Sequence, residues 1–399
     1  MPGWKRDMTD AFRKFRVTAR IRESDVVTSF HFMPVDGGPL WQALPGQYLT
    51  LRVPNGAGTV LKTYSLSGDV QQDNFHRISV KREGAPDGSE FPDGVGSCWL
   101  HDRVEEGHEI DIAPPRGGFV LDQASIRPVV LLAGGIGITP LLAMAKVLAR
   151  SNRQVWIVHA CENGDVQAFD GELKALAAAS DGRICLHVTY RHPTARDRAD
   201  GGFDSEGLID KALLQSLLPL DDYDVYMCGP TAFMIAVYCL LRSLGIEKNR
   251  IVYEFFGAAS SLEKLAEQPI QVPRAASRAP KAIAALAHLT DPEAWAIPDA
   301  SELLANAGSG MAGNSGNIVR FAKSGVTATM KGDVRTLLEL AEETGLEPDF
   351  SCRSGICNSC RSRLVEGKVS YLEEPLETPP DGQVLICCAR PEGHVVLDI

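Results

Sequence analysis

The chain has 399 residues, of which 44% are hydrophobic and 23% charged, with a formal net charge of −11. This length suggests two to three domains, and the composition suffices for several packed cores. The acidic balance argues against nucleic-acid binding, which requires a basic face, and gives no reason to expect a membrane surface as partner. The N-terminal residues lack the apolar core of a secretory signal, so we expect a cytoplasmic protein.

Residues 10–124 consist of short segments in which apolar and polar side chains alternate, such as FRVTARI, QYLTLRV and HRISVKRE. Glycine, proline and Asn-Gly separate these segments. Short strands at this spacing predict an all-β barrel or sandwich.

Two phrases in this β-rich part suggest a binding site. Residues 63–67, TYSLS, follow Lys62, and an aromatic ring followed by hydroxyls can stack on a flat ring and bond its polar edge. The phrase GVGSCWLHD places Gly94, Gly96 and Ser97 before a helical turn, where glycine amides suit a pyrophosphate. Each phrase alone is a weak signal, because a strand tyrosine more often belongs to a core.

Residues 125–257 alternate apolar strand-like runs, such as RPVVLLAG, with helical stretches such as PLLAMAKVLA. This alternation predicts a parallel sheet with helices on both faces. The phrase AGGIGITP stands between a strand and a helix, where bare glycines allow close approach of a phosphate. A strand-to-helix turn without a ligand can also be glycine-rich. A second phrase, CGP at residues 228–230, again follows a strand and favours a nucleotide site.

Residues 258–316 are rich in Ala, Pro, Gly, Ser and Asn, which predicts a linker. Residues 317–399 then combine strand segments such as HVVLDI with one helix, DVRTLLELAEETG. This segment is short for a domain and would gain stability from a bound metal.

Clustered cysteines near the C-terminus form the most specific pattern in the chain. Cys352, Cys357 and Cys360 have the C-x4-C-x2-C spacing of plant-type [2Fe–2S] ligands, which a distant fourth cysteine completes. The candidates for the fourth ligand are Cys387 and Cys388. Structural zinc is the alternative, but zinc sites usually use paired C-x2-C knuckles, and only one half of such a pair is present.

With these phrases, residues 317–399 resemble a plant-type ferredoxin, which is a β-grasp domain. CRSGICNSC matches the cluster-binding loop of that family, and LICCARP matches its closing L-x-C-x-A-x-P phrase. The resemblance implies that Cys387 is the fourth ligand and Cys388 its neighbour. Gly355 stands where the loop must turn sharply, so that backbone N–H groups can donate to the sulfurs.

The first two parts resemble the ferredoxin–NADP reductase superfamily, whose flavin phrase is R-x-Y-S-x-S. The resemblance implies an antiparallel β-barrel for the flavin, with Tyr64 and Ser65 facing the isoalloxazine ring, and favours FAD over FMN. Lys62 departs from the family pattern, because lysine keeps the charge of arginine but loses its bidentate fork. The flavin-binding residues implied by the match are Lys62, Thr63, Tyr64, Ser65, Val80, Lys81, Gly96, Ser97 and Cys98.

The nicotinamide domain of that superfamily carries phrases that match AGGIGITP and CGP. The match implies that Thr139 and Cys228 lie beside the nicotinamide. YEFFG resembles the segment that closes over the flavin, with Glu254 and Phe255 as candidates, so the catalytic candidates are Ser65, Cys228 and Glu254. The nucleotide-binding residues implied by the match are Gly134, Gly135, Gly137, Thr139, Pro140, Cys228, Gly229 and Pro230, together with Phe255 at the flavin.

The choice between NADH and NADPH depends on residues that could hold a 2′-phosphate. HACENG, after the second strand of the nucleotide domain, offers no basic residue, whereas Arg191, Arg196 and Arg198 follow the third strand. The sequence favours NADH.

The order of flavin barrel, nucleotide domain and ferredoxin resembles reductase components of bacterial oxygenases, of the phthalate dioxygenase and phenylacetyl-CoA epoxidase reductase types, and also the hybrid-cluster-protein reductase. The first two domains also resemble the reductase half of flavohaemoglobin. The resemblance implies an oxidoreductase that passes electrons from NAD(P)H through FAD and a [2Fe–2S] cluster to a redox partner, the terminal component of a mono- or dioxygenase. The alternatives are a non-oxygenase acceptor, such as a hybrid-cluster protein, or a flavin and iron–sulfur redox sensor.

Three arginines, Arg353, Arg361 and Arg363, lie around the cysteine loop in the sequence. We hypothesise that they form a basic rim that docks an acidic patch on the acceptor. The alternative is that they belong to a solvated loop.

Overall fold

A computed structural model of the chain describes residues 12–56, 58–85, 93–255, 262, 317–330, 336–346, 348–350, 353, 355–356, 358–372 and 374–399. The chain divides into two compact units, Met1–Ala259 and Ser260–Ile399. The expected linker, residues 258–316, lies outside the described residues except for Leu262. Its bounds, and the division of the first unit at residues 124 and 125, stay predictions.

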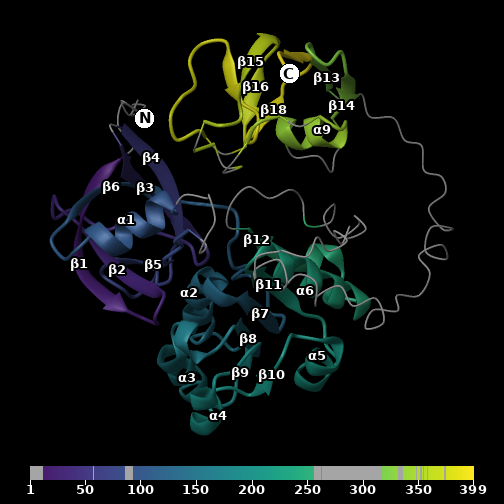
Figure 1. The fold of residues 1–399 in the computed structure, drawn as a ribbon. Helices are drawn as coiled ribbons and strands as arrows, with labels where there is room; N and C mark the ends of the chain where they lie inside the picture. The colour runs from purple at the N-terminus through teal and green to yellow at the C-terminus, as the bar shows by residue number, and fades with distance from the viewer. Residues whose placement is uncertain are drawn as a thin grey trace, which may run out of the picture. The chain divides into compact units, whose positions relative to one another are not determined.

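The first half of the first unit is an antiparallel barrel (Figure 1). Its six strands pair in the order β4-β3-β6-β1-β2-β5, and a bridge between Leu66 and Ile78 joins the two edge strands. Phe15, Phe30 and Leu49 point inward as parts of its core. The strands are β1 (Arg13–Arg22), β2 (Val27–Pro34), β3 (Tyr48–Asn55), β4 (Gly58–Ser65), β5 (His76–Lys81) and β6 (Glu109–Arg116).

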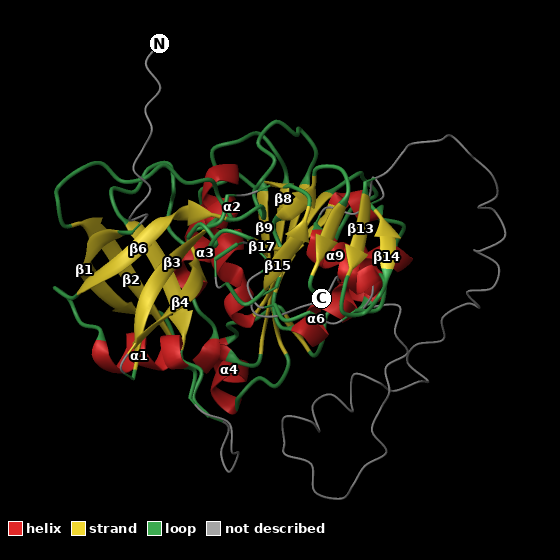
Figure 2. Cartoon of the chain, turned by 90° about the horizontal axis from the view of Figure 1, so that it is seen from above, coloured by secondary structure: helices red, strands yellow, loops and turns green. Residues whose placement is uncertain are grey.

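Helix α1 (Val95–Arg103) closes one end of the barrel (Figure 2). Leu100 on this helix is completely buried and belongs to the barrel core, which is why the helix packs across the strand ends. Its first residues thereby lie beside β4 and β5, the strands that carry the predicted flavin residues.

The second half of the first unit is a parallel sheet, as the alternation of apolar strands and helices predicts. Its strands are β7 (Val129–Gly134), β8 (Val155–Cys161), β9 (Ile184–Tyr190), β10 (Ser205–Glu206), β11 (Asp224–Cys228) and β12 (Ile251–Glu254). Its helices are α2 (Ile138–Leu148), α3 (Asp170–Ala178), α4 (Ala195–Asp200), α5 (Lys211–Leu217) and α6 (Thr231–Ser243). Figure 1 draws α2 and α3 on one side of the sheet and α5 and α6 on the other.

The strand order β10-β9-β8-β7-β11-β12 reverses direction between β7 and β11. In open parallel sheets, ligands bind outside the carboxyl ends of the strands at such a reversal. AGGIGITP begins at the end of β7 and CGP at the end of β11, so the topology brings the two predicted nucleotide phrases together.

The second unit has a five-stranded mixed sheet with the order β14-β13-β19-β15-β17, and a separate pair, β16-β18. Strands β13 and β19 are parallel, and helix α9 (Leu337–Glu343) packs on the sheet through Leu337, Leu338 and Leu340. The capping box of Thr336 and Glu339 starts this helix. The strands are β13 (Ile318–Phe321), β14 (Thr327–Thr329), β15 (Arg361–Glu366), β16 (Val369–Tyr371), β17 (Gln383–Leu385), β18 (Ala389–Pro391) and β19 (Val395–Leu397).

Among the described residues, no helix combines the length and the apolar character needed to cross a bilayer.

Candidate functional site

The predicted flavin phrase lies at the end of β4. Lys62 and Thr63 are exposed, Tyr64 is half-buried, and Ser65 is buried at the last position of the strand. Burial raises the pKa of the Tyr64 hydroxyl far above its ordinary value, and Glu83 and Cys98 add to this effect. Tyr64 is therefore a neutral aromatic surface at neutral pH, suited to stacking on a flat ring.

The predicted phosphate-binding residues at the start of α1 lie next to this phrase. A Cβ on Gly96 would stand 2.4 Å from the Tyr64 hydroxyl and 2.8 Å from Lys62 Cγ, so a larger residue there would displace these two side chains. Ser97 Oγ accepts from the Glu83 N–H at 3.2 Å, and the Cys98 thiol donates to the Glu83 carbonyl oxygen at 3.3 Å. These bonds fix the helix start against the segment that follows β5.

Val80 and Lys81, at the end of β5, complete the predicted flavin set. Val80 is buried and Lys81 exposed. The Val80 carbonyl oxygen accepts from His101 Nε2 of α1 at 2.7 Å. The structure thus brings the β4, β5 and α1 residues to one end of the barrel, and their roles in flavin binding stay predictions.

The glycines after β7 meet the CGP phrase through backbone contacts. A Cβ on Gly137 would lie 2.1 Å from the Cys228 carbonyl oxygen, and one on Gly229 would lie 3.0 Å from Gly134 Cα. Gly134 itself lies against Pro230 and Phe233. Close packing between two chain segments therefore requires these glycines, in addition to any demand from a ligand.

Gly135 has a different reason to be glycine. Its φ of +51° is a left-handed conformation, and no atom lies within 4 Å of the position of a Cβ. The turn therefore exposes bare backbone at the switch point, which fits the approach of a phosphate. Thr139 and Pro140 follow in the first turn of α2, and the Thr139 hydroxyl donates to the Ile136 carbonyl oxygen at 3.1 Å.

The three catalytic candidates lie together between the barrel and the sheet. Ser65 Oγ donates to Glu254 Oε2 at 3.5 Å, and Glu254 pairs with Cys228 in the register of β12 and β11. Burial raises the pKa of Glu254 to about 8, and the hydrogen bond from Ser65 lowers it in part. Burial also raises the pKa of the Cys228 thiol, and Glu254 adds to this shift. At neutral pH both groups hold their protons.

Phe255 follows directly after β12. Its ring meets the ring of Tyr253 edge-on, with the centroids 5.5 Å apart. Phe256 and Gly257, the rest of the YEFFG phrase, lie outside the described residues.

His159 on β8 is a residue of this site that motif analysis misses. Its side chain is completely buried, and Nε2 donates to the Gly135 carbonyl oxygen at 3.0 Å, which holds the glycine turn. Burial lowers the pKa of His159 to about 4, so the ring is neutral. Within the described residues Nδ1 has no hydrogen-bond partner. In the sequence, a histidine within the apolar run QVWIVHAC is the signal that could have indicated this residue.

The basic residues beyond β9 are engaged with carboxylates. Arg198 bonds Glu206 at 2.7 Å, Arg196 bonds Asp200 at 3.4 Å, and His192 bonds Glu162 at 2.5 Å. A 2′-phosphate would have to compete with these carboxylates, which agrees with the sequence preference for NADH.

The second unit carries the predicted cluster site. Cys352 and Cys357 lie outside the described residues, whereas Cys360 and Cys387 are buried at the edge of the core. The Gly355 N–H donates to Cys387 Sγ at 3.3 Å, which is the backbone-to-sulfur bond expected of the loop. Gly355 has a φ of +68°, and its missing side chain makes room for Cys388 Sγ.

The two candidates for the fourth ligand differ in their surroundings. Cys387 Sγ receives the loop N–H, whereas the Cys388 thiol donates to the Leu385 carbonyl oxygen at 3.5 Å. A sulfur that accepts from the loop backbone fits a thiolate ligand, and a thiol that bonds a carbonyl oxygen fits a neutral core residue. This supports Cys387, and the ligand set stays a prediction.

The proposed basic rim needs a correction for Arg353. Its guanidinium forms a two-pronged ion pair with Glu342 and lies 4.1 Å from the centre of the Phe350 ring. Arg353 therefore connects Phe350 with Glu342 of α9. Because Glu342 already neutralises its charge, Arg353 does not contribute to a basic rim. Arg361 and Arg363 on β15 are exposed, as the hypothesis requires.

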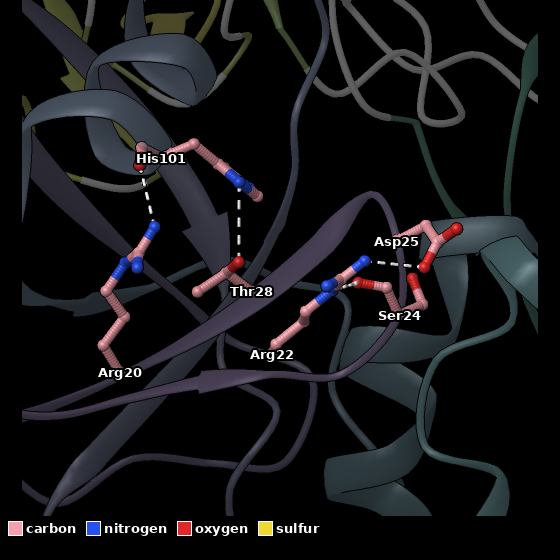
Figure 3. Close-up of a pocket in the computed structure, with 6 residues that line it drawn as sticks. All are labelled: Arg20, Arg22, Ser24, Asp25, Thr28 and His101. Carbon is pink, nitrogen blue, oxygen red and sulfur yellow. Dashed lines mark hydrogen bonds and ion pairs between the residues drawn. The ribbon is translucent and has the colours of Figure 1, made fainter.

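A separate cavity of about 260 Å³ lies on the barrel between β1, β2 and α1 (Figure 3). Arg20 donates to the His101 carbonyl oxygen at 2.8 Å, and Arg22 pairs with Asp25 at 2.7 Å. Thr28 Oγ1 lies 3.4 Å from His101 Nδ1. Several polar groups of this cavity bond to one another, and none of the predicted site residues lines it.

Two family matches agree with this arrangement. Residues 131–238 match the oxidoreductase NAD-binding domain, and residues 319–392 match the 2Fe-2S iron-sulfur cluster binding domain. The second match decides between the two interpretations of the cysteine spacing in favour of an iron–sulfur cluster.

Known proteins resemble about two thirds of the chain in sequence. A flavohemoprotein of Rhodopirellula baltica is 43% identical over 269 residues, which cover 66% of this chain and 64% of that protein. A flavohemoprotein of Bacillus cereus is 40% identical over 265 residues, which cover 65% of this chain and 63% of that protein. The chain thus spans slightly less than two thirds of the length of these curated relatives.

Solved structures extend the comparison. The flavohem-like FAD/NAD-binding domain of nitric oxide dioxygenase from Vibrio cholerae has a TM-score of 0.54 and 36% identity, over 61% of this chain and 98% of that one. Phthalate dioxygenase reductase has a TM-score of 0.52 over 97% of this chain and 98% of that one. At 24% identity, the second likeness concerns the fold alone.

Proposed function

Since this chain belongs to the ferredoxin–NADP reductase superfamily of FAD- and NAD-binding oxidoreductases and carries a 2Fe-2S domain, we propose that it is an electron-transfer reductase for a separate protein acceptor. Electrons enter from NADH and leave through the cluster, and the acceptor is the terminal component of an oxygenase. One observation carries the proposal: Ser65 of the flavin-type phrase contacts Glu254, which pairs with Cys228 of the CGP phrase in the strand register, in a chain that also has a 2Fe-2S domain.

The residues fit the cofactors that this function requires. Bare backbone at Gly135 fits a phosphate, Tyr64 beside Gly96 fits a flat ring next to a helix start, and the Gly355 N–H already bonds a ligand-type sulfur. When bound, the flavin converts between the two-electron chemistry of NADH and the one-electron chemistry of the cluster.

The protein's own side chains provide hydrogen bonds and an uncharged environment at the site. Ser65 Oγ–H donates to Glu254, the protonated carboxyl of Glu254 offers a hydrogen-bond donor where the two lobes meet, and burial of Cys228 keeps its thiol neutral. Neutral groups around the site avoid a charge that would oppose the arrival of electrons. His159 holds the glycine turn in place through its hydrogen bond to the Gly135 carbonyl oxygen.

Anaerobic titration with NADH tests the proposal. The purified protein should contain FAD and about two iron atoms per chain, and NADH should bleach the flavin and produce the paramagnetic signal of a reduced [2Fe–2S] cluster. A Cys360→Ser variant should still reduce ferricyanide but fail to reduce the partner protein. Transfer to the partner that survives loss of the cluster would contradict the proposed route.

A second acceptor class has a specific observation in its favour. Over 269 residues the chain is 43% identical to a flavohemoprotein, so its relatives in sequence are not limited to reductases of oxygenases. A non-oxygenase acceptor, such as a haem or hybrid-cluster protein, therefore belongs in the same assay. Transfer of two electrons to the acceptor protein for each NADH oxidised would support an electron-transfer reductase over a redox sensor, whichever acceptor is used.

A further inference from the structure

Helix α2 runs from the nucleotide turn to the flavin phrase. It begins at Ile138, directly after the glycine turn, and all its side chains are buried. Near its C-terminal end, Lys146 Nζ donates to the carbonyl oxygen of Ser67, in the segment after β4, at 3.3 Å. Ser67 is the last residue of the TYSLS phrase, two positions after Ser65, and it is completely buried. One helix thus spans the distance between the two predicted binding regions.

Two further charged residues surround this contact. Glu172 of α3 accepts from Lys146 Nζ at 2.6 Å and from Arg77 of β5 at 3.0 Å. Arg77 in turn donates to the Ser67 carbonyl oxygen at 2.5 Å. Lys146 and Arg77 each bond both the Glu172 carboxylate and the Ser67 carbonyl oxygen, so four groups from β5, α2, α3 and the segment after β4 close a ring.

A second contact lies one helical turn further on. Arg150 forms a two-pronged ion pair with Asp69, at 2.5 and 3.0 Å, and also bonds Gln71 at 3.0 Å. Lys146 and Arg150 together grip residues 67–71, the segment that continues the flavin phrase. Two contacts to one short segment, from Lys146 and from Arg150, restrict both its position and its direction.

Burial makes this ring depend on all its members. The side chains of Lys146 and Arg77 are each 11% exposed. Burial lowers the pKa of Lys146, and Arg77 adds to this, whereas Glu172 opposes it. Burial would raise the pKa of Glu172, but Arg77 and Lys146 hold it below its ordinary value. A buried charge is tolerated only with its partners, so removing one member leaves the others uncompensated.

We propose that Lys146, Glu172 and Arg77 are positioning residues that hold the flavin phrase at a fixed distance from the nucleotide turn. None of the three belongs to the predicted flavin-binding or nucleotide-binding residues. They act through the Ser67 carbonyl oxygen and through α2. The inference rests on the proposed function, because a fixed distance matters only if a group is transferred between the two regions. Displacing reacting atoms by about 1 Å can slow a reaction about a hundredfold.

Lys146→Met tests the proposal, because it keeps the length of the side chain and removes its charge. Amide hydrogen exchange of residues 64–71 should accelerate about tenfold relative to wild type. In the flavin-loaded protein, the rate of flavin reduction at saturating NADH should fall about tenfold or more, while flavin content and the Kd for NADH stay near wild type. Lys146→Arg, which keeps the charge, should restore most of both properties.

Lys174→Met is the matched control, because Lys174 is exposed and, among the residues that the structure describes, pairs only with Asp170 of its own helix, at 2.8 Å. If exchange and reduction rate in Lys146→Met equal those of this control, the proposal is overturned. A loss of rate that only follows a loss of flavin or of folded protein would also overturn it. If wild-type protein fails to oxidise NADH, the proposed function fails, and hydrogen exchange still decides whether Lys146 holds the segment.

Discussion

Ser65 Oγ and Glu254 Oε2 lie 3.5 Å apart, although the two residues are 189 positions apart in the sequence and belong to different halves of the first unit. Their contact places a hydroxyl from the barrel against a buried carboxyl from the sheet. Because this carboxyl has a pKa of about 8, its charge changes within the working range of most enzymes.

Glu254 should make flavin reduction depend on pH. Below pH 8 the carboxyl is neutral, and above pH 8 it carries a negative charge that opposes the arrival of electrons nearby. The reduction rate by NADH, followed by stopped-flow absorbance, should therefore fall as pH rises through 8. Glu254→Gln should remove this dependence and keep most of the low-pH rate. Ser65→Ala should move the midpoint upward, because the hydrogen bond from Ser65 lowers the pKa.

The same group should affect stability with a definite sign. The folded pKa of about 8 exceeds the ordinary value of 4.5, so the folded protein keeps a proton that the unfolded chain releases. The free energy of unfolding should fall as pH rises from 4.5 to 8, by up to about 1.4 kcal/mol for each pH unit. Urea denaturation of Glu254→Gln should lack this contribution. A parallel pH profile for the two proteins would contradict the raised pKa.

Replacing the two adjacent cysteines should separate ligand from neighbour. Cys387→Ala should lose the cluster, with iron falling from about two atoms per chain to near zero, because it removes a thiolate that the loop N–H supports. Cys388→Ala should keep the iron and the reduced paramagnetic signal, with a modest loss of stability, because its thiol bonds only a carbonyl oxygen of the core. The reverse pattern would assign the ligand to Cys388.

Two glycines in the nucleotide turn should respond differently to alanine. Gly137→Ala would place a Cβ 2.1 Å from the Cys228 carbonyl oxygen, and we expect it to cost about 3 kcal/mol of stability. Gly135→Ala meets open space and should cost about 1 kcal/mol through its left-handed φ alone. Urea denaturation measures the loss of stability in each variant. Equal losses would show that the backbone at Gly137 does not pack tightly against Cys228.

NADH should be the preferred coenzyme, because Arg196, Arg198 and His192 beyond β9 are each already bonded to a carboxylate. We expect kcat/KM for NADH to exceed that for NADPH about tenfold or more. Replacing Asp200 and Glu206 together by Asn and Gln should narrow this ratio. Steady-state kinetics with both coenzymes measures the effect, and a higher kcat/KM with NADPH in wild type would refute it.

Charge reversal on β15 should weaken delivery to the partner. Arg361→Glu combined with Arg363→Glu should slow electron transfer to an acidic acceptor about tenfold at low salt and spare ferricyanide reduction. Arg353→Ala is the contrasting variant, because Arg353 pairs with Glu342 and should affect the stability of the cluster loop instead. Unchanged partner kinetics in the double variant would dismiss the docking surface.

The features that could be predicted from the sequence are those whose residues lie close together along the chain. The cysteine spacing indicated the cluster before the family match confirmed it, and the alternation of strands and helices predicted the parallel sheet. Such signals can be read from the sequence because ligand-binding turns need glycine or cysteine at positions that the local chain geometry dictates. The glycines at 134, 137 and 229 illustrate the limit, since the sequence suggested a phosphate and the structure adds backbone packing between two segments.

The sequence by itself determined the cofactor classes and the order of the parts. Only the tertiary structure decided which charged residues are already paired, as Arg353 is with Glu342, and which distant residues meet, as Lys146, Glu172 and Arg77 do around Ser67. The physical reason is that an ion pair between residues on separate elements leaves no pattern along the chain. Its partners are chosen by the packing of helices on strands, which forms only when the whole unit folds.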